Sequence, residues 1–124
     1  MKKFTSKTQK IGKLGENIVC QHLISKGFLI IDRNFTRKWG EIDVVAKKQG
    51  ITHFIEVKSV SCESFLRPED QMTTLKQRKM IRVINSYIAI HDMGNWVFDV
   101  ACVYIDSINR KARVKIINDV ILGS

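Results

Sequence analysis

The sequence contains little proline, little cysteine and no long apolar run. One proline in 124 residues, and no Gly/Ser-rich or repeated stretch, leaves no obvious linker. The cysteines, Cys20, Cys62 and Cys102, lie far apart and form no C-x-x-C pair, which disfavours a disulfide framework or a thiolate zinc site. The apolar runs are far shorter than the roughly 18–20 residues of a membrane-spanning helix. We therefore expect one cytoplasmic domain, residues 1–124, with no membrane span.

Acidic residues are also scarce relative to basic ones. The chain has 21 Lys and Arg against 12 Asp and Glu, a formal net charge of +9. The basic residues are spread along the whole chain. Such a surplus favours polyanionic partners, because binding to phosphates releases counterions. Charge alone leaves open both a nucleic-acid partner and a soluble protein that is merely basic.

The first third of the chain predicts a helix and then a strand. The helix covers residues 7–26 and ends at Gly27, which suits a C-cap. A strand is predicted over 28–35, with a turn at 37–40. One side of the helix is apolar and the other carries Lys7, Lys10 and Lys13; the apolar side consists of Ile11, Leu14, Ile18, Val19 and Leu23.

The rest of the chain predicts a hairpin, a second helix and two more strands. The hairpin strands are 40–46 and 54–59, turning near 47–50, and a loop with Pro68 covers 60–72. Thr73 or Thr74 is expected to cap a helix that runs to about His91. Strands follow at 96–105 and 113–117, the latter at an edge. The second helix is expected to bury Leu75, Met80, Val83, Ile84, Tyr87 and Ile88.

This order, αβββαββ, predicts an α/β fold in which a mixed β-sheet has helices on its faces. Alternation along the hairpin strands predicts two unlike faces. Ile42, Val44, Ile55 and Val57 would form a dry face. The opposite face would carry Glu41, Asp43, Glu56 and Lys58.

The polar face of this hairpin suggests a cation site. A tight turn would set Asp43 opposite Phe54, and a turn one pair wider would set it opposite Glu56. In both registers the Asp43 and Glu56 Cβ atoms lie within roughly 5–8 Å of each other. Carboxylate oxygens suit Mg²⁺ or Mn²⁺. The alternative is an ordinary solvated face, which the repulsion between two facing carboxylates disfavours.

These residues resemble a known pattern. Asp43 followed by Glu56-Val57-Lys58 is similar to the catalytic core of the PD-(D/E)xK nuclease superfamily, and Gly15-Glu16 completes the form seen in its archaeal Holliday-junction-resolvase-like branch. Nearly the whole chain resembles the bacterial YraN family. The proline of the superfamily's name is replaced by Ile42, and Ser59-Val60 stands where threonine-arginine is frequent. Further matches are Gly12, Arg33-Asn34-Phe35, Gly40-Glu41-Ile42, Pro68-Glu69, Lys76-Gln77-Arg78 and Phe98-Asp99-Val100.

The resemblance implies a restriction-endonuclease-like fold and a function. Asp43, Glu56, Glu16 and the backbone carbonyl of Val57 would bind Mg²⁺ or Mn²⁺, and Lys58 would orient the attacking water. The implied activity is a metal-dependent DNA endonuclease, resolvase-like, acting in DNA repair, recombination or other DNA processing on a substrate that could be branched. The alternative is a non-catalytic nucleic-acid-binding module on the same fold. Resolvase-like relatives also suggest a homodimer.

Other residues carry weaker signals. Glu41 is either a partner behind the site or an ordinary charge. Asp99, inside an apolar strand, is expected to pair with Arg or Lys, and Trp39 either stacks on a base or covers the core. The three histidines lack ligand spacing. Basic residues that could contact phosphates, or simply be solvated, are Lys76, Arg78, Lys79, Arg37 and Lys38.

Overall fold

The computed structural model describes residues 7–61, 73–120 and 122. The predicted loop with Pro68 and the Pro68-Glu69 motif fall mostly in 62–72, outside the described residues, as does Cys62. The predicted order is confirmed, with most strands longer than expected. The elements are α1 (Lys7–Ser25), β1 (Leu29–Arg37), β2 (Gly40–Lys48), β3 (Ile51–Ser61), α2 (Thr74–Ile90), β4 (Trp96–Asp106) and β5 (Lys111–Ile117).

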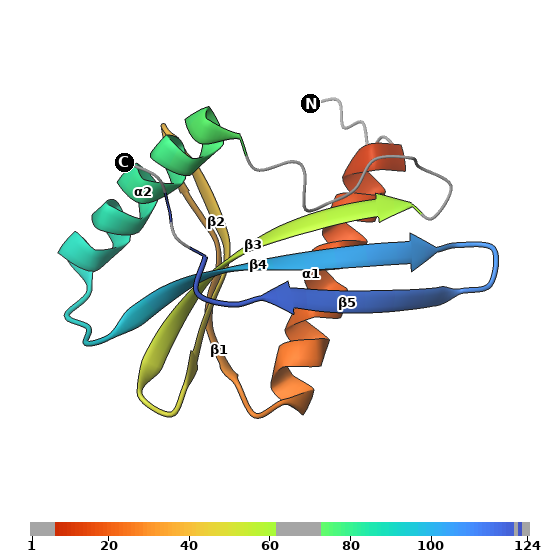
Figure 1. Ribbon diagram of the computed structural model, residues 1–124, viewed down its shortest axis with the longest axis horizontal. Helices are drawn as coiled ribbons and strands as arrows, with labels where there is room; N and C mark the ends of the chain where they lie inside the picture. The colour runs from red at the N-terminus through yellow and green to blue at the C-terminus, as the bar shows by residue number, and fades with distance from the viewer. Residues whose placement is uncertain (1–6, 62–72, 121, 123–124) are drawn as a thin grey trace, which may run out of the picture.

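The strands form one mixed sheet in the order β1-β2-β3-β4-β5. Only β3 and β4 pair in parallel, because α2 connects them and allows the chain to return in the same direction. The other neighbours are antiparallel. Figure 1 shows α1 behind β3, β4 and β5, and α2 on the opposite side toward β2. The expected α/β sheet with helices on its faces is therefore confirmed, and β5 lies at an edge.

Both faces of the sheet are buried, so the prediction of one dry face and one polar face on the hairpin is wrong. Strict alternation would place Val45 and Phe54 on the polar side, but both are fully buried and pack with Ile42 in the core under α2. Val44 and Ile55 pack in a second core under α1. Ile42 and Val44 thus lie on opposite faces. The alternation of β2 breaks at Asp43, between them.

The hairpin register matches the wider of the two predicted turns. Gln49 and Gly50 both have positive φ, 51° and 79°, as a type I′ turn requires. Pairing between β2 and β3 ends at Val44 opposite Ile55. Beyond that pair, β2 pairs only with β1, and β3 pairs only with β4. The two strands therefore separate inside the sheet, and we call this opening the strand split.

The helix ends agree with the predictions, but two leucines that were expected on the buried helix faces are exposed. Gly27 has φ 91°, and the Thr73 hydroxyl accepts a hydrogen bond from the Lys76 amide at 3.3 Å. Leu14 and Leu75 are 47% and 60% exposed. Leu75 lies in the first turn of α2, whereas Leu14 lies on the side edge of the α1 face, because Ile11 and Ile18, one turn before and after it, both pack against the core. Among the described residues, no helix is long and apolar enough to cross a membrane.

Asp99 is buried, but the prediction that it pairs with Arg or Lys is wrong. One Asp99 oxygen lies 2.6 Å from Nδ1 of His53, and the other accepts from the Asp119 amide at 2.9 Å. His53 also contacts the Phe28 ring edge-on. These bonds tie β3, β4 and the segment after β5 together, so we assign Asp99 and His53 to the fold.

Gly15 allows α1 to approach β3 closely. A Cβ added at Gly15 would lie 1.9 Å from Oγ and 2.9 Å from Cβ of Ser59. Rotation of Ser59 could move Oγ, but its Cβ moves only with the backbone of β3. The glycine thus sets the distance of α1 from the sheet and the position of the adjacent Glu16.

We expect Gly15→Ala to destabilise the fold by about 1–3 kcal/mol, because α1 must move away from β3. Gly12→Ala is the matched control on the same helix. Nothing lies within 4 Å of the added methyl group there, so it should stabilise by up to about 1 kcal/mol. Urea unfolding measures both. Ser59→Gly should partly rescue Gly15→Ala, and equal stability of the two alanine variants would contradict this packing.

Candidate metal centre

Asp43 occupies the strand split. Its Oδ2 accepts a hydrogen bond from the Val57 amide at 2.8 Å, in place of a backbone carbonyl of β2. The side chain therefore lies between the two strands and is only 8% exposed as a residue. The N–H and C=O of one strand residue point toward the same edge, so the Val57 carbonyl also faces the split. The opening combines a buried carboxylate with a backbone oxygen.

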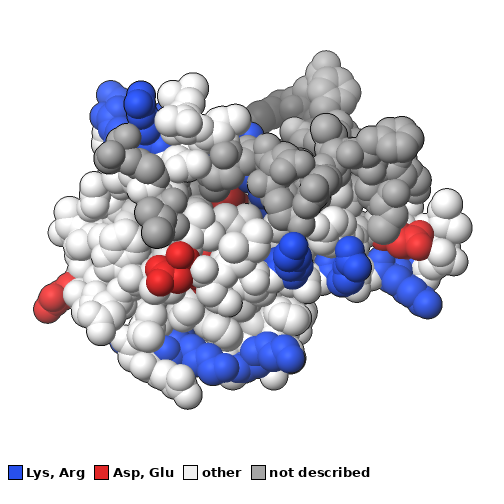
Figure 2. All heavy atoms as spheres, viewed as in Figure 1, with Lys and Arg blue, Asp and Glu red and all other residues white. Residues whose placement is uncertain are grey.

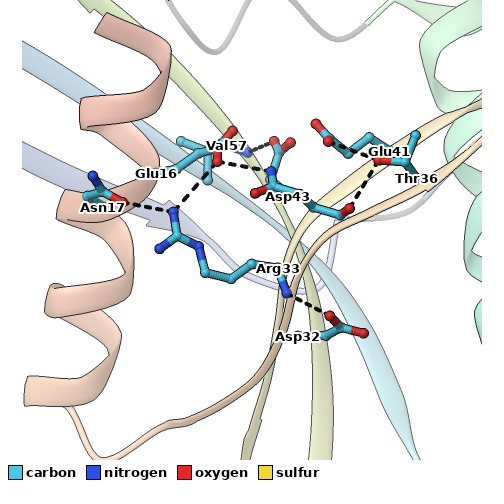
Figure 3. Close-up of polar contacts among 9 residues, drawn as sticks. Glu16, Asn17, Asp32, Arg33, Thr36, Glu41, Asp43 and Val57 are labelled. Carbon is cyan, nitrogen blue, oxygen red and sulfur yellow. Dashed lines mark hydrogen bonds and ion pairs between the residues drawn. The ribbon is translucent and has the colours of Figure 1, made fainter. Parts of the chain in front are cut away.

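Three carboxylates meet at this point. Glu16 comes from α1, while Glu41 and Asp43 come from β2, and one ligand oxygen from each lies within 4.8 Å of the others. Figure 3 shows Glu16 reaching across from α1 toward Asp43 at the split. Glu16 and Asp43 both belong to the predicted metal ligands, and the structure brings their carboxylates together. Glu41, left open by the sequence, joins them.

The surroundings of Asp43 disfavour its charged form. Burial acts first, followed by repulsion from the Glu56 carboxyl and its hydrogen bond to Asp43, and the pKa of Asp43 is raised to about 10. Glu16 adds a smaller repulsion, and the hydrogen bond from the Val57 amide opposes the shift. A positive charge close to this carboxylate would oppose these effects and favour its ionised form.

Glu56 and Lys58 lie on the α2 side of the split. Lys58 Nζ is 3.1 Å from a Glu56 oxygen, and both side chains are largely buried. Glu56 is thus shared between Lys58 and Asp43 and lies outside the tight group of three carboxylates. The structure brings the predicted residues into one place, but Glu56 contacts Lys58, and Glu41 takes its place in the group with Glu16 and Asp43.

A cleft of about 170 Å³ opens beside this pair. It brings the sheet residues Glu56 and Lys58 next to Lys76 and Lys79 of α2. Arg78, Arg37 and Lys38 do not line it, and the Arg37 guanidinium lies over the Phe35 ring. Trp39 lines the cleft with the Arg82 guanidinium 4.4 Å from its ring centroid. The remaining lining residues are Gly40, Glu41, Met80 and Val83.

Two neighbours hold Glu16, and sequence reasoning had given neither of them a role. The Asn34 amide donates to Glu16 Oε1 at 3.0 Å, and an Arg33 nitrogen lies 3.7 Å from the same oxygen. Arg33 is itself held by Asn17 at 2.9 Å (Figure 3). Asn34 has φ 54°, a conformation that Asn adopts more readily than most residues. The sequence offered one signal for Asn34: it belongs to the Arg33-Asn34-Phe35 motif that resembles the YraN pattern.

The donor set fits a hard divalent cation. Three carboxylates and a nearby backbone carbonyl are oxygen ligands of the kind that Mg²⁺ and Mn²⁺ prefer, whereas zinc sites favour His and Cys. No His or Cys belongs to the cluster. A bound cation would also relieve the repulsion that raises the pKa of Asp43. Glu16, Glu41, Asp43 and the Val57 carbonyl would hold it, with Glu56 able to join.

We expect Asn34→Gly to weaken divalent-cation binding by about tenfold, because Glu16 loses the amide that orients it. Glycine accepts the positive φ, so the backbone is not strained. Gln49→Gly is the control, since Gln49 has φ 51° in the turn away from the site. Calorimetric titration with Mn²⁺ measures both. Equal affinity of the two variants would remove Asn34 from any role in the site.

Sequence comparisons identify the family of this chain. The family model described as "Uncharacterised protein family UPF0102" matches residues 15–103. A UPF0102 protein of Campylobacter fetus is 38% identical over 112 residues, 88% of this chain and 91% of that protein. One of Campylobacter lari is 42% identical over 98 residues, 78% and 86% of the two chains. One of Clostridium botulinum strain Loch Maree is 36% identical over 112 residues, 88% and 91%. The chain therefore belongs to family UPF0102, the YraN family.

Proposed function

We propose that this protein is a Mg²⁺- or Mn²⁺-dependent endonuclease that hydrolyses phosphodiester bonds in DNA. One observation carries the proposal: a buried aspartate at the strand split lies among further carboxylates, beside a lysine in a cleft lined by two more lysines. Carboxylates alone would suit many cations. The lysines add a preference for an anionic substrate next to the cation position.

Each group has a role in the proposed hydrolysis. A bound cation would neutralise charge developing on the scissile phosphate and make a water more acidic. Lys58 carries three N–H donors, of which one is directed to Glu56, so it can also orient the attacking water. Lys76 and Lys79 would contact neighbouring phosphates. The water loses a proton as its oxygen bonds to phosphorus, the P–O3′ bond breaks, and the leaving O3′ takes up a proton from solvent, so the products are a 5′-phosphate and a 3′-hydroxyl.

The second candidate is a nucleic-acid-binding module without catalysis. The contact between Lys58 and Glu56 favours it, because a lysine engaged in an ion pair is less available to water. It predicts salt-dependent DNA binding with no cation requirement and no cleavage. The first candidate predicts that a cation binds Asp43 and that cleavage depends on it.

The test is a panel of duplex, single-stranded, flapped and branched DNA, together with RNA, incubated with Mg²⁺, Mn²⁺ or EDTA. Cleavage of at least one substrate with either cation and none in EDTA supports the endonuclease. Binding without cleavage on every substrate, together with no cation binding in calorimetry, supports the binding module. Sedimentation of the protein with and without branched DNA tests the proposed homodimer.

A further inference from the structure

The edge strand β5 carries a row of basic side chains on the same side of the sheet as α2. Val114 and Ile116 pack into the core under α1, so the alternate residues of β5 point to the other face. We name these the β5 row, and all three are exposed: Lys111, Arg113 and Lys115. Figure 2 shows blue side chains along the surface where β5 lies in Figure 1.

The β5 row continues from the cleft across the sheet. Lys58 lies opposite Cys102 on β4, and Cys102 lies opposite Lys115 on β5. Two strand spacings separate Lys58 from Lys115, roughly 10 Å. The helix α2 packs mainly against β2, so it does not extend over β5. A chain of phosphates leaving Lys58 would therefore meet Lys115 next.

Tyr104 holds the central residue of the row. Arg113 lies opposite Tyr104 in the β4–β5 ladder, and its guanidinium is 4.6 Å from the centre of the tyrosine ring. Stacking on an aromatic ring fixes the plane of a guanidinium, which suits a bidentate contact with phosphate. Asp106 is the one acidic residue of β4 and β5 on this face, and it accepts hydrogen bonds from Asn109.

We propose that the β5 row binds the phosphodiester backbone of the nucleic acid whose scissile phosphate lies at the strand split. This inference rests on the proposed function and adds the path of the substrate. Lys111, Arg113 and Lys115 are two residues apart, so their Cα atoms repeat at roughly 6.8 Å along the strand. That repeat is close to the separation of successive phosphates in a nucleic-acid strand. The contacts are with backbone phosphates and carry no sequence preference.

The test replaces all three residues with glutamine and measures binding of labelled duplex and single-stranded DNA in EDTA, where cleavage cannot interfere. We expect affinity at low salt to fall about tenfold or more, and the slope of log affinity against log salt to become shallower by about 2–3 units. Arg113→Lys, which keeps the charge but loses the planar fork, should lower affinity several-fold. The DNA form that loses more affinity, duplex or single-stranded, is the form that crosses β5.

The control variant replaces Lys10, Lys26 and Lys47 with glutamine and so removes the same three positive charges. These lysines are also exposed, but they lie outside the cleft and the β5 row. The control variant should change affinity much less. Wild-type affinity in the β5 variant, or an equal loss in the control variant, would overturn the inference and leave the cation site standing. Mn²⁺ stabilisation of the β5 variant should match wild type, which shows that the split is intact. Absence of salt-dependent binding by the wild type would overturn both this inference and the proposed function.

Discussion

Asp43→Asn is expected to reduce cation-dependent cleavage by about three orders of magnitude or more, because the position loses the charge that holds the cation. The substitution keeps the shape of the side chain and an oxygen that can accept from the Val57 amide. Binding of DNA in EDTA should therefore persist. The measurement is the single-turnover cleavage rate on the best substrate of the panel, with Mn²⁺ in excess.

Two further variants make this result specific. Lys58→Gln should also abolish most cleavage, while Lys38→Gln, a lysine outside the cleft, should leave it nearly unchanged. Cleavage at the wild-type rate by purified Asp43→Asn would assign the activity to a contaminant. It would also remove the strand split as the catalytic centre.

The second large effect is a pH-dependent loss of stability in the cation-free protein. Because the folded-state pKa of Asp43 is raised to about 10, the folded protein keeps a proton that the unfolded chain has released. This stabilisation is fully present below the ordinary pKa of Asp and is lost as pH rises toward the folded pKa. The melting temperature in EDTA should therefore fall between about pH 5 and pH 8.

A divalent cation should reverse this loss, and more so at higher pH, since it displaces the Asp43 proton. We expect the gain in melting temperature from Mg²⁺ or Mn²⁺ to be larger at pH 8 than at pH 6. Asp43→Asn supplies the control, because it has no proton to release. It should melt several degrees above wild type in EDTA at pH 8 and gain little from the cation. Equal cation stabilisation of both proteins at both pH values would place the cation elsewhere.

Local patterns predicted much of the fold. Gly27, Thr73 and the Gln49-Gly50 turn act through short-range geometry, so the element order, the helix ends at Gly27 and Thr73, and the hairpin turn could be read along the chain, whereas most strand ends could not. Leu14 and Leu75 were misjudged because periodicity identifies an apolar helix face but does not say how much of its width or length the sheet covers. The hairpin faces were misjudged because both sides of this sheet are covered, so strict alternation between apolar and polar residues does not apply.

The candidate site could be predicted only in part. Spacing brought Asp43, Glu56 and Lys58 together, and the family resemblance added Glu16. The strand split could not be read from the sequence, because it depends on where two ladders stop pairing. Glu41 joins Glu16 and Asp43 at that separation, and Asn34 reaches Glu16 from β1. Glu56 and Lys58 are two residues apart on β3, so their common face, but not their ion pair, could be read from the sequence.

The bond from Val57 to Asp43 also makes one amide a built-in reporter of the site. The Val57 amide donates its hydrogen bond to the Asp43 carboxylate, which gains or loses the proton and would contact the cation. In a ¹⁵N-labelled protein, this amide gives a resolved backbone signal. Its chemical shift should follow both titrations, and its hydrogen exchange should follow local opening of the split. Occupancy of this centre can thus be read from a single backbone signal, with no substrate and no turnover.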